Sequence, residues 1–235
     1  MRRIVISDTH IGSNFYRSGE LLEFLRTQQM DQLILAGDII DFIKIPTLTR
    51  NCAKIFDAIG EKTDVVYIVG NHDESLAGWI GSDIFGIKFT RALEFTESGR
   101  TFRIEHGDRY TTGPIHTAAL VKVISVLQSL LEAWFGVDLT SWWVRRQLRK
   151  HKLRSVSAIL NVNNDVDVFI MGHTHIPEVV IWVHADQSIK TYVNSGDWVT
   201  HMTYVEIDDG KVRLREFKPH KLRANEDSSQ SQNRD

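Results

Sequence analysis

The stretch Arg3-Ile4-Val5-Ile6-Ser7-Asp8-Thr9-His10 decides the fold, because a short apolar run leads straight into two residue types that bind metals. A continuous apolar run of this length is typical of a strand buried on both faces of a parallel sheet. Helical patterns follow at 21–25 and 52–59, so strand, loop and helix alternate and an α/β fold is expected. The same order of apolar run and polar loop recurs at 33–36 before Gly37-Asp38, 65–69 before Gly70-Asn71, 101–105 before His106 and 168–171 before Gly172-His173.

These polar loops should meet, because open α/β sheets place their ligands outside the carboxyl ends of the strands. Two neighbouring divalent cations repel each other, so a site for both needs several anionic or imidazole ligands and one carboxylate that bridges them. Asp38 is the candidate bridge. Oxygen and imidazole ligands without thiolate suit Mn, Fe, Zn or Co, and of these we expect Mn first. The loops are Asp8-Thr9-His10, Gly37-Asp38 with Asp41, Gly70-Asn71-His72-Asp73, His106-Gly107-Asp108 and Gly172-His173-Thr174-His175.

Taken in this order, the five motifs resemble those of the calcineurin-like metallophosphoesterases. The resemblance extends from Asp8 to about Trp198. It implies two divalent metal ions and a bridging hydroxide that attacks phosphorus in line, without a covalent intermediate. The ligands implied for one metal are Asp8, His10, Asp38 and His175, and those for the other are Asp38, Asn71, His106 and His173.

The resemblance also implies roles for residues that hold no metal. His72 would protonate the leaving oxygen or stabilise charge on the phosphoryl group, and Asp73 would orient it. Asp41 would contact a ligand rather than a metal. Asp108 would likewise contact a ligand rather than a metal, or it is a turn residue, because Gly-Asp is also a common turn signal. The remaining histidines are expected to be ordinary polar side chains: His116, His151, His184, His201 and His220.

The fold that the resemblance implies is a four-layer α/β/β/α sandwich, with two mixed sheets packed face to face. Late in the chain, four runs predict an antiparallel group of strands, with Asp208-Asp209-Gly210 as the turn of the last pair. Trp182 lies in a continuous apolar strand and is expected in the core. The four runs are 179–183, 189–193, 202–207 and 212–217.

The composition of the chain limits its possible domain organisation and partners. A chain of 235 residues with 42% hydrophobic and 25% charged residues predicts one globular domain, which we place at 1–222, and a disordered polar tail at 223–235. A net charge of -2 gives no bulk attraction to nucleic acid, and no nucleic-acid partner is expected. Cys52 is the single cysteine and is expected to pack in the core. A strand so close to Met1 leaves no room for a signal peptide, so a cytoplasmic protein is expected.

The segment 114–165 predicts a helical insert. Its first half, 115–135, has a wide apolar stripe but carries Lys122, Gln128 and Glu132, which a membrane span would not tolerate. One explanation is that its aromatics pack on the body while its cations stay solvated. The other is a lid that receives acyl chains and holds a pyrophosphate, or a helix lying on the anionic inner membrane. The candidate substrate-binding residues are Trp142, Trp143, Arg145, Arg146 and Arg149.

An insert between these two motifs is similar to that of the UDP-2,3-diacylglucosamine pyrophosphatases, as is the ending Asn194-Ser195-Gly196-Asp197-Trp198. That branch implies hydrolysis of a nucleotide-linked lipid to UMP and a lipid sugar phosphate. Its best-known members carry Arg where this chain has His72, and unlike Arg, His can give up a proton. The alternatives are a general metallophosphodiesterase on nucleotides or small diesters, and a non-catalytic scaffold. Nothing in the sequence indicates an oligomeric state.

Overall fold

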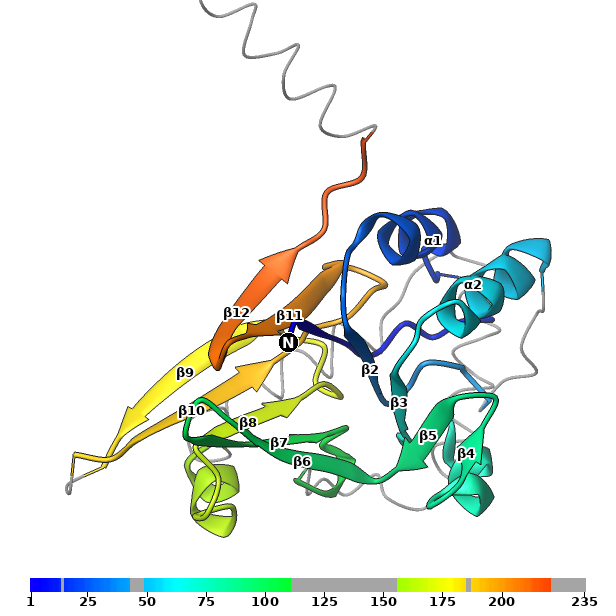
Figure 1. Ribbon diagram of the computed structural model, residues 1–235. Helices are drawn as coiled ribbons and strands as arrows, with labels where there is room; N and C mark the ends of the chain where they lie inside the picture. Colours follow the sequence, from blue (N-terminus) through cyan, green and yellow to red (C-terminus); the bar gives the residue numbers. More distant parts are fainter. Residues whose placement is uncertain (14, 43–48, 111–155, 185–186, 221–235) are drawn as a thin grey trace, which may run out of the picture.

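In the computed structural model, two β-sheets face each other and helices lie outside them (Figure 1). The structure describes residues 1–13, 15–42, 49–110, 156–184 and 187–220. The insert up to residue 155, with its candidate substrate-binding residues Trp142, Trp143, Arg145, Arg146 and Arg149, and the tail from residue 223 lie outside these ranges. In the described ranges no helix is both long and apolar enough to cross a membrane.

Among the described residues the first sheet has seven strands, of which β1, β2, β3 and β5 are parallel to one another. At one side β11 pairs antiparallel with β1 and β12 pairs antiparallel with β11, and at the other side β4 pairs antiparallel with β5. The sheet is therefore mixed, as expected. In spatial order its strands are β12 (Lys211–Glu216), β11 (Thr203–Asp208), β1 (Arg3–Ile6), β2 (Gln32–Ala36), β3 (Val65–Ile68), β5 (Ile87–Thr90) and β4 (Asp83–Ile84).

The second sheet, in the part of the chain that the structure describes, has five strands and is also mixed. Its central strands β7, β8 and β10 are parallel, and β6 and β9 form antiparallel edges. Apolar side chains of both sheets, among them Ile34 and Ile170, are fully buried between the two layers. In spatial order the strands are β6 (Ala92–Glu97), β7 (Arg100–Glu105), β8 (Val168–Met171), β10 (Ile189–Asn194) and β9 (Glu178–Val183).

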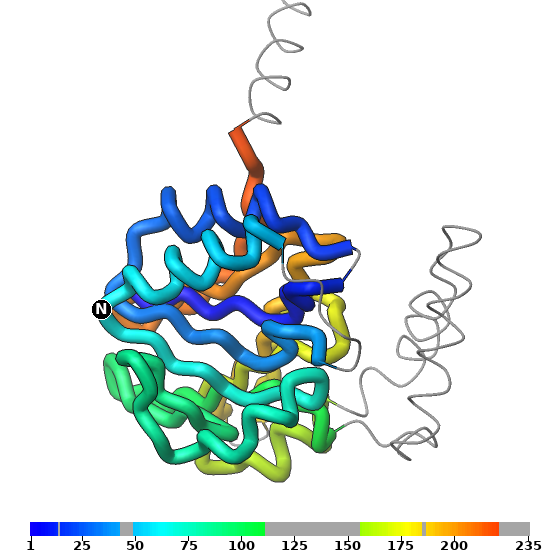
Figure 2. The backbone as a smooth tube through the Cα atoms, turned by 90° about the vertical axis from the view of Figure 1, so that its right-hand side faces the viewer, coloured from blue at the N-terminus to red at the C-terminus, as the bar shows by residue number. Residues whose placement is uncertain are grey.

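Helices cover the outer face of each sheet (Figure 2). On the first sheet lie α1 (Ser18–Thr27) and α2 (Arg50–Gly60). In α1 the apolar residues Leu21, Phe24 and Leu25 share one face and are buried. On the second sheet lies a helix at 156–162, whose Leu160 packs with Phe169 of β8. The four-layer α/β/β/α arrangement is thus present. Two short 3-10 helices, η1 (Glu74–Trp79) and η2 (Asp108–Tyr110), follow two of the polar loops.

Two expectations about the strands need correction. The late strands do not form one antiparallel group: β9 and β10 belong to the second sheet, whereas β11 and β12 belong to the first. A period-two pattern specifies which face of a strand is buried but not which strand lies beside it, and this explains the error. Trp182 is only partly buried, against the cluster beneath the helix at 156–162, whereas Trp198 is in the main core.

The topology brings the polar loops to one place. The carboxyl ends of β1, β2 and β3 lie at the same edge of the first sheet, because these strands are parallel. The parallel strands β7 and β8 deliver His106 and His173 in the second sheet. A hydrogen bond from the Gly172 N–H to the His106 carbonyl oxygen, 3.1 Å long, ties these two loops together.

Candidate metal centre

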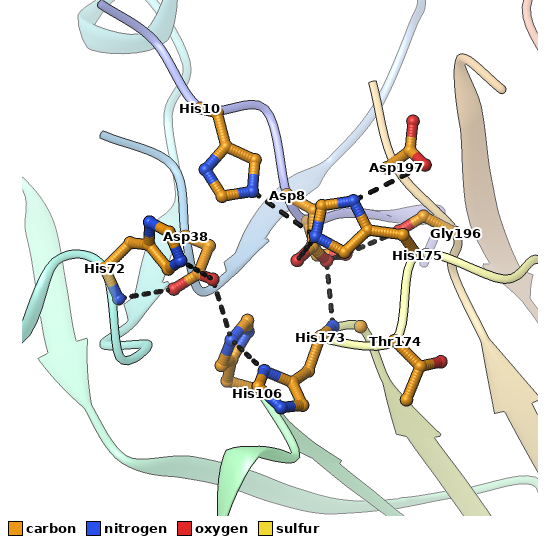
Figure 3. A network of polar contacts seen from close by, with 12 residues as sticks. Asp8, His10, Asp38, His72, His106, His173, Thr174, His175, Gly196 and Asp197 are labelled. Carbon is orange, nitrogen blue, oxygen red and sulfur yellow. Dashed lines mark hydrogen bonds and ion pairs between the residues drawn. The ribbon is translucent and has the colours of Figure 1, made fainter. Parts of the chain in front are cut away.

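Aspartate and histidine side chains from five loops converge at this common edge (Figure 3). Three overlapping groups have ligand atoms that all lie within 4.8 Å of one another. Each group combines imidazole with carboxylate, and each draws its members from at least two loops. The groups are Asp8 with His10 and His175, His10 with Asp38 and His72, and Asp38 with His106 and His173.

The first group surrounds the Nε2 atom of His175. This atom is 3.2 Å from Asp8 Oδ1 and 3.4 Å from His10 Nε2. The rings of His10 and His175 are stacked, with 5.2 Å between their centroids. The Asp8 carboxylate is fully buried and is held from behind, because its Oδ2 accepts hydrogen bonds from the His173 N–H and from the Ser7 hydroxyl.

The other end of the site surrounds the Nε2 atom of His106. It is 3.2 Å from Asp38 Oδ2, 3.1 Å from Asn71 Oδ1 and 3.2 Å from His173 Nδ1. These four residues are those implied as ligands of one metal by the family resemblance. Asp38 also belongs to the neighbouring group with His10, so its position between the two ends is compatible with a bridging carboxylate.

The backbone at these loops is in an unusual conformation. Asp8, His10, Asp38, His173 and His175 all have a positive φ, between 47° and 64°. Residues other than glycine rarely adopt this left-handed region, and such strain gathers at sites where the surrounding structure requires one exact placement of a side chain. These five residues all belong to the three ligand groups of the centre.

Two glycines allow the loops to approach one another. A Cβ atom at Gly70 would overlap the Asp38 carboxylate, and one at Gly172 would overlap both Ser7 Oγ and Asp8 Oδ2. Any larger residue would therefore displace an aspartate from the centre. This explains why a glycine follows each of these two strands.

Hydrogen bonds on the far side of two imidazoles fix which nitrogen faces the centre. The Nδ1 atom of His106 lies 3.1 Å from the Ala36 carbonyl oxygen, so it donates there and leaves Nε2 to face Asp38. The Nδ1 atom of His175 lies 3.5 Å from Asp197 Oδ2. A carboxylate behind a histidine sets its tautomer and raises its basicity as a ligand.

The pKa values of the group follow from burial and from the neighbouring charges. Burial alone would raise the pKa of Asp38, but the imidazoles of His106 and His72 hold it well below its usual value. Burial would lower the pKa of His106, but the charge of Asp38 raises it to about 10. Burial lowers the pKa of His10 and His173 to about 3 each, so these two are neutral and present a lone pair. Metal binding at His106 has to release a proton.

The donor set fits divalent cations. The Oδ1 atom of Asp8 is buried and accepts no hydrogen bond from any described residue, although the His175 Nε2 atom lies 3.2 Å from it. Burying a carboxylate oxygen without a hydrogen bond destabilises the folded protein unless a cation contacts that oxygen. The donors are carboxylate oxygen, amide oxygen and imidazole nitrogen, with no thiolate among the grouped residues. We therefore assign Asp8, His10, Asp38, Asn71, His106, His173 and His175 as the proposed metal ligands.

The structure corrects the role expected of Asp73. Its carboxylate is fully buried and accepts hydrogen bonds from the Ile39 N–H at 3.0 Å and the Tyr67 hydroxyl at 2.7 Å, which direct it away from the His72 ring. Asp73 therefore ties the loops after β2 and β3 together. The partner of the His72 ring is Asp41, whose Oδ1 lies 3.1 Å from His72 Nδ1. The sequence suggested Asp73 because it adjoins His72, but adjacent side chains in a loop point in different directions.

Asp108 is the last residue of the His106-Gly107-Asp108 loop. It begins the short helix η2, and it belongs to none of the three groups found among the described residues. The pKa of Arg91 is raised mainly by its hydrogen bond to Glu74, and the charge of Asp108 adds to this effect. The two interpretations of Asp108, as a residue behind a ligand or as a turn residue, both stay predictions.

Asp197 and His201 are the residues that sequence reasoning missed. The Asp197 carboxylate is fully buried, and its Oδ2 lies between His175 Nδ1 and His201 Nδ1, the latter at 3.0 Å. His201 therefore supports the carboxylate behind a proposed ligand instead of being an ordinary surface side chain. The signal was present in Gly196-Asp197-Trp198, which the sequence used only to recognise a branch of the family.

We expect Asp197→Asn to weaken metal binding at the end of the site that contains His175. The change keeps the size of the side chain but removes the charge that orients the imidazole, and such changes commonly cost about 10–100-fold in affinity. Metal titration followed by calorimetry would measure this. Asp165→Asn, at an exposed position, is the matched control. Unchanged affinity of both metals in Asp197→Asn would contradict the orienting role.

A histidine and aspartate centre at the strand ends of an α/β/β/α sandwich defines a metal-dependent phosphoesterase. The comparisons with known proteins agree. The sequence pattern of the family described as calcineurin-like phosphoesterase matches residues 1–177, so the chain belongs to the calcineurin-like phosphoesterase family. Members of this family bind two metal ions, and the candidate ligand groups are intact in this chain.

Curated relatives resemble the chain over most of its length. A UDP-2,3-diacylglucosamine hydrolase of Psychromonas ingrahamii is 22% identical over 242 residues, which cover 91% of this chain and 96% of that protein. One of Porphyromonas gingivalis is 22% identical and covers 86% of this chain and 92% of that protein. A component of the SbcCD nuclease of Escherichia coli is 36% identical, but over only 31% of this chain and 21% of that protein.

Solved structures of related proteins share low identity with the chain. A phosphoesterase of E. coli, Yfce, is 15% identical with a TM-score of 0.45, and the match covers 93% of this chain and all of that one. Vps29 of Chaetomium thermophilum is 13% identical with a TM-score of 0.48, covering 93% and 99%.

Proposed function

We propose that the chain hydrolyses the pyrophosphate bond of a UDP-linked acylated sugar, with UDP-2,3-diacylglucosamine as the first candidate substrate and UMP and a lipid sugar phosphate as products. The observation that carries this proposal is the match to two UDP-2,3-diacylglucosamine hydrolases over 91% and 86% of the chain. A match of this extent includes the region of the insert, which a match limited to the metal motifs would not.

The side chains of the centre suit attack of water on phosphorus. Two divalent cations, when bound, would supply Lewis acidity and lower the pKa of a coordinated water. The proposed ligands hold the centre rigid, because Asp8, Asp38 and His106 are each at most 1% exposed. The side chain of His72 is 29% exposed, so it stands at the open rim, where a phosphoryl group can reach it.

His72 is the proposed acid-base residue. Its Nδ1 faces Asp41 at 3.1 Å, which leaves Nε2 directed to the centre, 3.9 Å from Asp38 Oδ2. In this orientation the imidazole can donate a proton to the leaving oxygen or hydrogen-bond to the phosphoryl group. Asp41 takes the orienting role that was expected of Asp73.

A second candidate function is a general phosphodiesterase acting on nucleotides or small diesters. The match to the SbcCD nuclease favours it, because that match is higher in identity, although it is confined to 85 residues. A phosphodiester needs the same attack on phosphorus but no acyl-binding surface. The intact ligand groups argue against the non-catalytic scaffold.

The test that separates the candidates is turnover of the full chain, reconstituted with Mn, on three substrates: UDP-2,3-diacylglucosamine, UDP-glucose and a small chromogenic diester. We expect strong preference for the acylated nucleotide, because apolar acyl burial adds to binding of the same reacting group. Equal or faster hydrolysis of the small diester would favour the general phosphodiesterase. Activity with Fe, Zn or Co that exceeds activity with Mn would change the metal assignment alone.

Several finer expectations are proposals too. Residues 1–222 form one domain, whose segment 114–165 is a lid that binds acyl chains and pyrophosphate through Trp142, Trp143, Arg145, Arg146 and Arg149. The alternatives for this segment are contact with an anionic membrane and simple packing. A cytoplasmic location at the inner membrane is compatible with an acylated substrate.

A further inference from the structure

The strand β9 forms an exposed apolar edge on the second sheet. Its residues Val179, Ile181 and Val183 have 48%, 66% and 64% of their surface exposed. Figure 1 shows β9 and β10 as a hairpin that extends away from α1 and α2. On β10, Ile189 faces Val183, is 56% exposed and extends the same apolar surface. In the described part of the second sheet no strand lies beyond β9.

The backbone groups of the same three residues point outward. The Thr191 N–H donates to the Asp167 carbonyl oxygen, 2.8 Å away on the β8 side, so Thr191 is not bonded to the residue that faces it on β9, Ile181. In an antiparallel ladder such a residue turns its own N–H and C=O away from its partner, and this alternates along the strand. Val179, Ile181 and Val183 therefore present three N–H and three C=O groups at the outward edge of β9.

This edge lacks the features that normally prevent strand pairing. Natural edge strands carry lysines, prolines, bulges or inward-pointing charges. The run Val179-Val180-Ile181-Trp182-Val183 has none of these, and all six residues of β9 pair with β10 in unbroken register. An exposed and flat edge with both apolar side chains and outward-facing backbone groups is suited to accept another strand.

We propose that the outward edge of β9 pairs with β9 of a second copy of this chain, antiparallel about a two-fold axis through Ile181. In this register Ile181 faces itself and Val179 faces Val183. These are the residues whose backbone groups point outward, so each facing pair exchanges two hydrogen bonds. The two five-stranded sheets then join into one continuous sheet.

The side chains of β9 suit this pairing. On one face, Ile181 meets Ile181 and Val179 meets Val183 of the second copy, which are apolar cross-strand pairs of the kind that stabilise sheets. On the other face, Val180 meets Trp182. At the ends of the strand, Glu178 faces His184 of the second copy, so a carboxylate meets an imidazole and no like charges face one another.

A second copy is a better partner for this edge than an unrelated strand. In antiparallel pairing the seven residues 178–184 are complementary to the same residues of the second copy. The pairing buries a single strand and its neighbours, an interface at the small end of those that are stable. We therefore expect reversible association. Because each copy keeps its own metal centre, the association needs no residue of the catalytic site.

The test is the mass of the full chain by sedimentation over a range of concentrations. We expect twice the mass of one chain, 27.0 kDa, at high concentration and the single mass on dilution. Ile181→Lys and Ile181→Glu should each give only the single mass, because each places like charges face to face on the axis. An equimolar mixture of the two variants should recover the double mass, because lysine then faces glutamate.

The matched control is Val162→Lys, which charges another exposed apolar residue, 73% exposed against 66% for Ile181, on the helix at 156–162. It should associate as the unchanged chain does. A chain of single mass at all concentrations, or a double mass that persists in Ile181→Lys, would overturn the proposal. Hydrogen exchange identifies what covers the edge. Protection of the Ile181 amide in a single-mass chain would indicate another segment of the same chain, which would also overturn it.

Discussion

Replacing Asp38 with alanine should remove both metal ions and abolish turnover. Its carboxylate is 1% exposed, belongs to two of the three ligand groups, and has Oδ2 at 3.2 Å from His106 Nε2. Burial would raise its pKa, but the surrounding imidazoles keep it ionised. Without this charge two divalent cations at one centre would repel each other with no shared anion between them.

Metal content per chain, measured by mass spectrometry after dialysis, tests this expectation together with turnover of a chromogenic diester. Asp38→Asn keeps the shape of the side chain and isolates the effect of the charge, in case alanine disturbs the loop whose N–H of His72 donates to Asp38. Asp57→Ala, at an exposed position on α2, is the control. Two metal ions retained in Asp38→Ala would show that Asp38 is not the bridge.

The metal centre was predictable because its chemistry is local in sequence. Asp8 and His10 follow a buried strand directly, and so do Asp38 and His106. The same parallel topology that makes a strand uniformly apolar also carries its carboxyl end to the common edge. For this reason the five loops could be grouped from the sequence alone.

Contacts that depend on side-chain direction were not predictable. The sequence assigned the orientation of His72 to its neighbour Asp73, whereas Asp41 makes that contact and Asp73 binds the Ile39 and Gly70 N–H groups. Asp197 and His201 lie far along the chain from the first motifs, and only the return of the chain after β10 places them behind His175. The direction of a side chain in a loop is set by the backbone angles φ and ψ, which composition does not encode.

The arrangement of sheets was also only partly predictable. Each apolar run was identified as a strand, but the strands β4, β5 and β6 were missed and the late strands were assigned to one group. Pairing partners depend on the order of crossovers, and β10 lies between β8 and β9 in space although β9 lies between β8 and β10 in the sequence. This strand order matters for the proposed pairing of two copies, because β9 presents an exposed edge only if it is the outermost strand of its sheet.

Replacing His72 with alanine should leave both metals in place and lower turnover by about 10²–10⁴-fold, the usual effect of losing an acid-base group. The side chain stands at the rim, 29% exposed, and its Nδ1 is held by Asp41. Its Nε2 is 3.9 Å from Asp38 Oδ2, farther than His106 Nε2 at 3.2 Å. One ligand group nevertheless contains His72, so its role as a metal ligand is the alternative that the experiment must separate.

Metal content and turnover together make this separation. Loss of a metal in His72→Ala, equal to that in Asp38→Ala, would contradict the acid-base role. If His72 protonates the leaving oxygen, the loss of turnover should be large for diesters with a strongly basic leaving oxygen and small for nitrophenyl diesters, which need no proton. His72→Arg is the informative partner, because arginine can hold a phosphoryl oxygen but gives up no proton. It should restore substrate binding but keep the strong dependence on the leaving group that His72→Ala shows, because an imidazole can release a proton to the leaving oxygen and a guanidinium cannot.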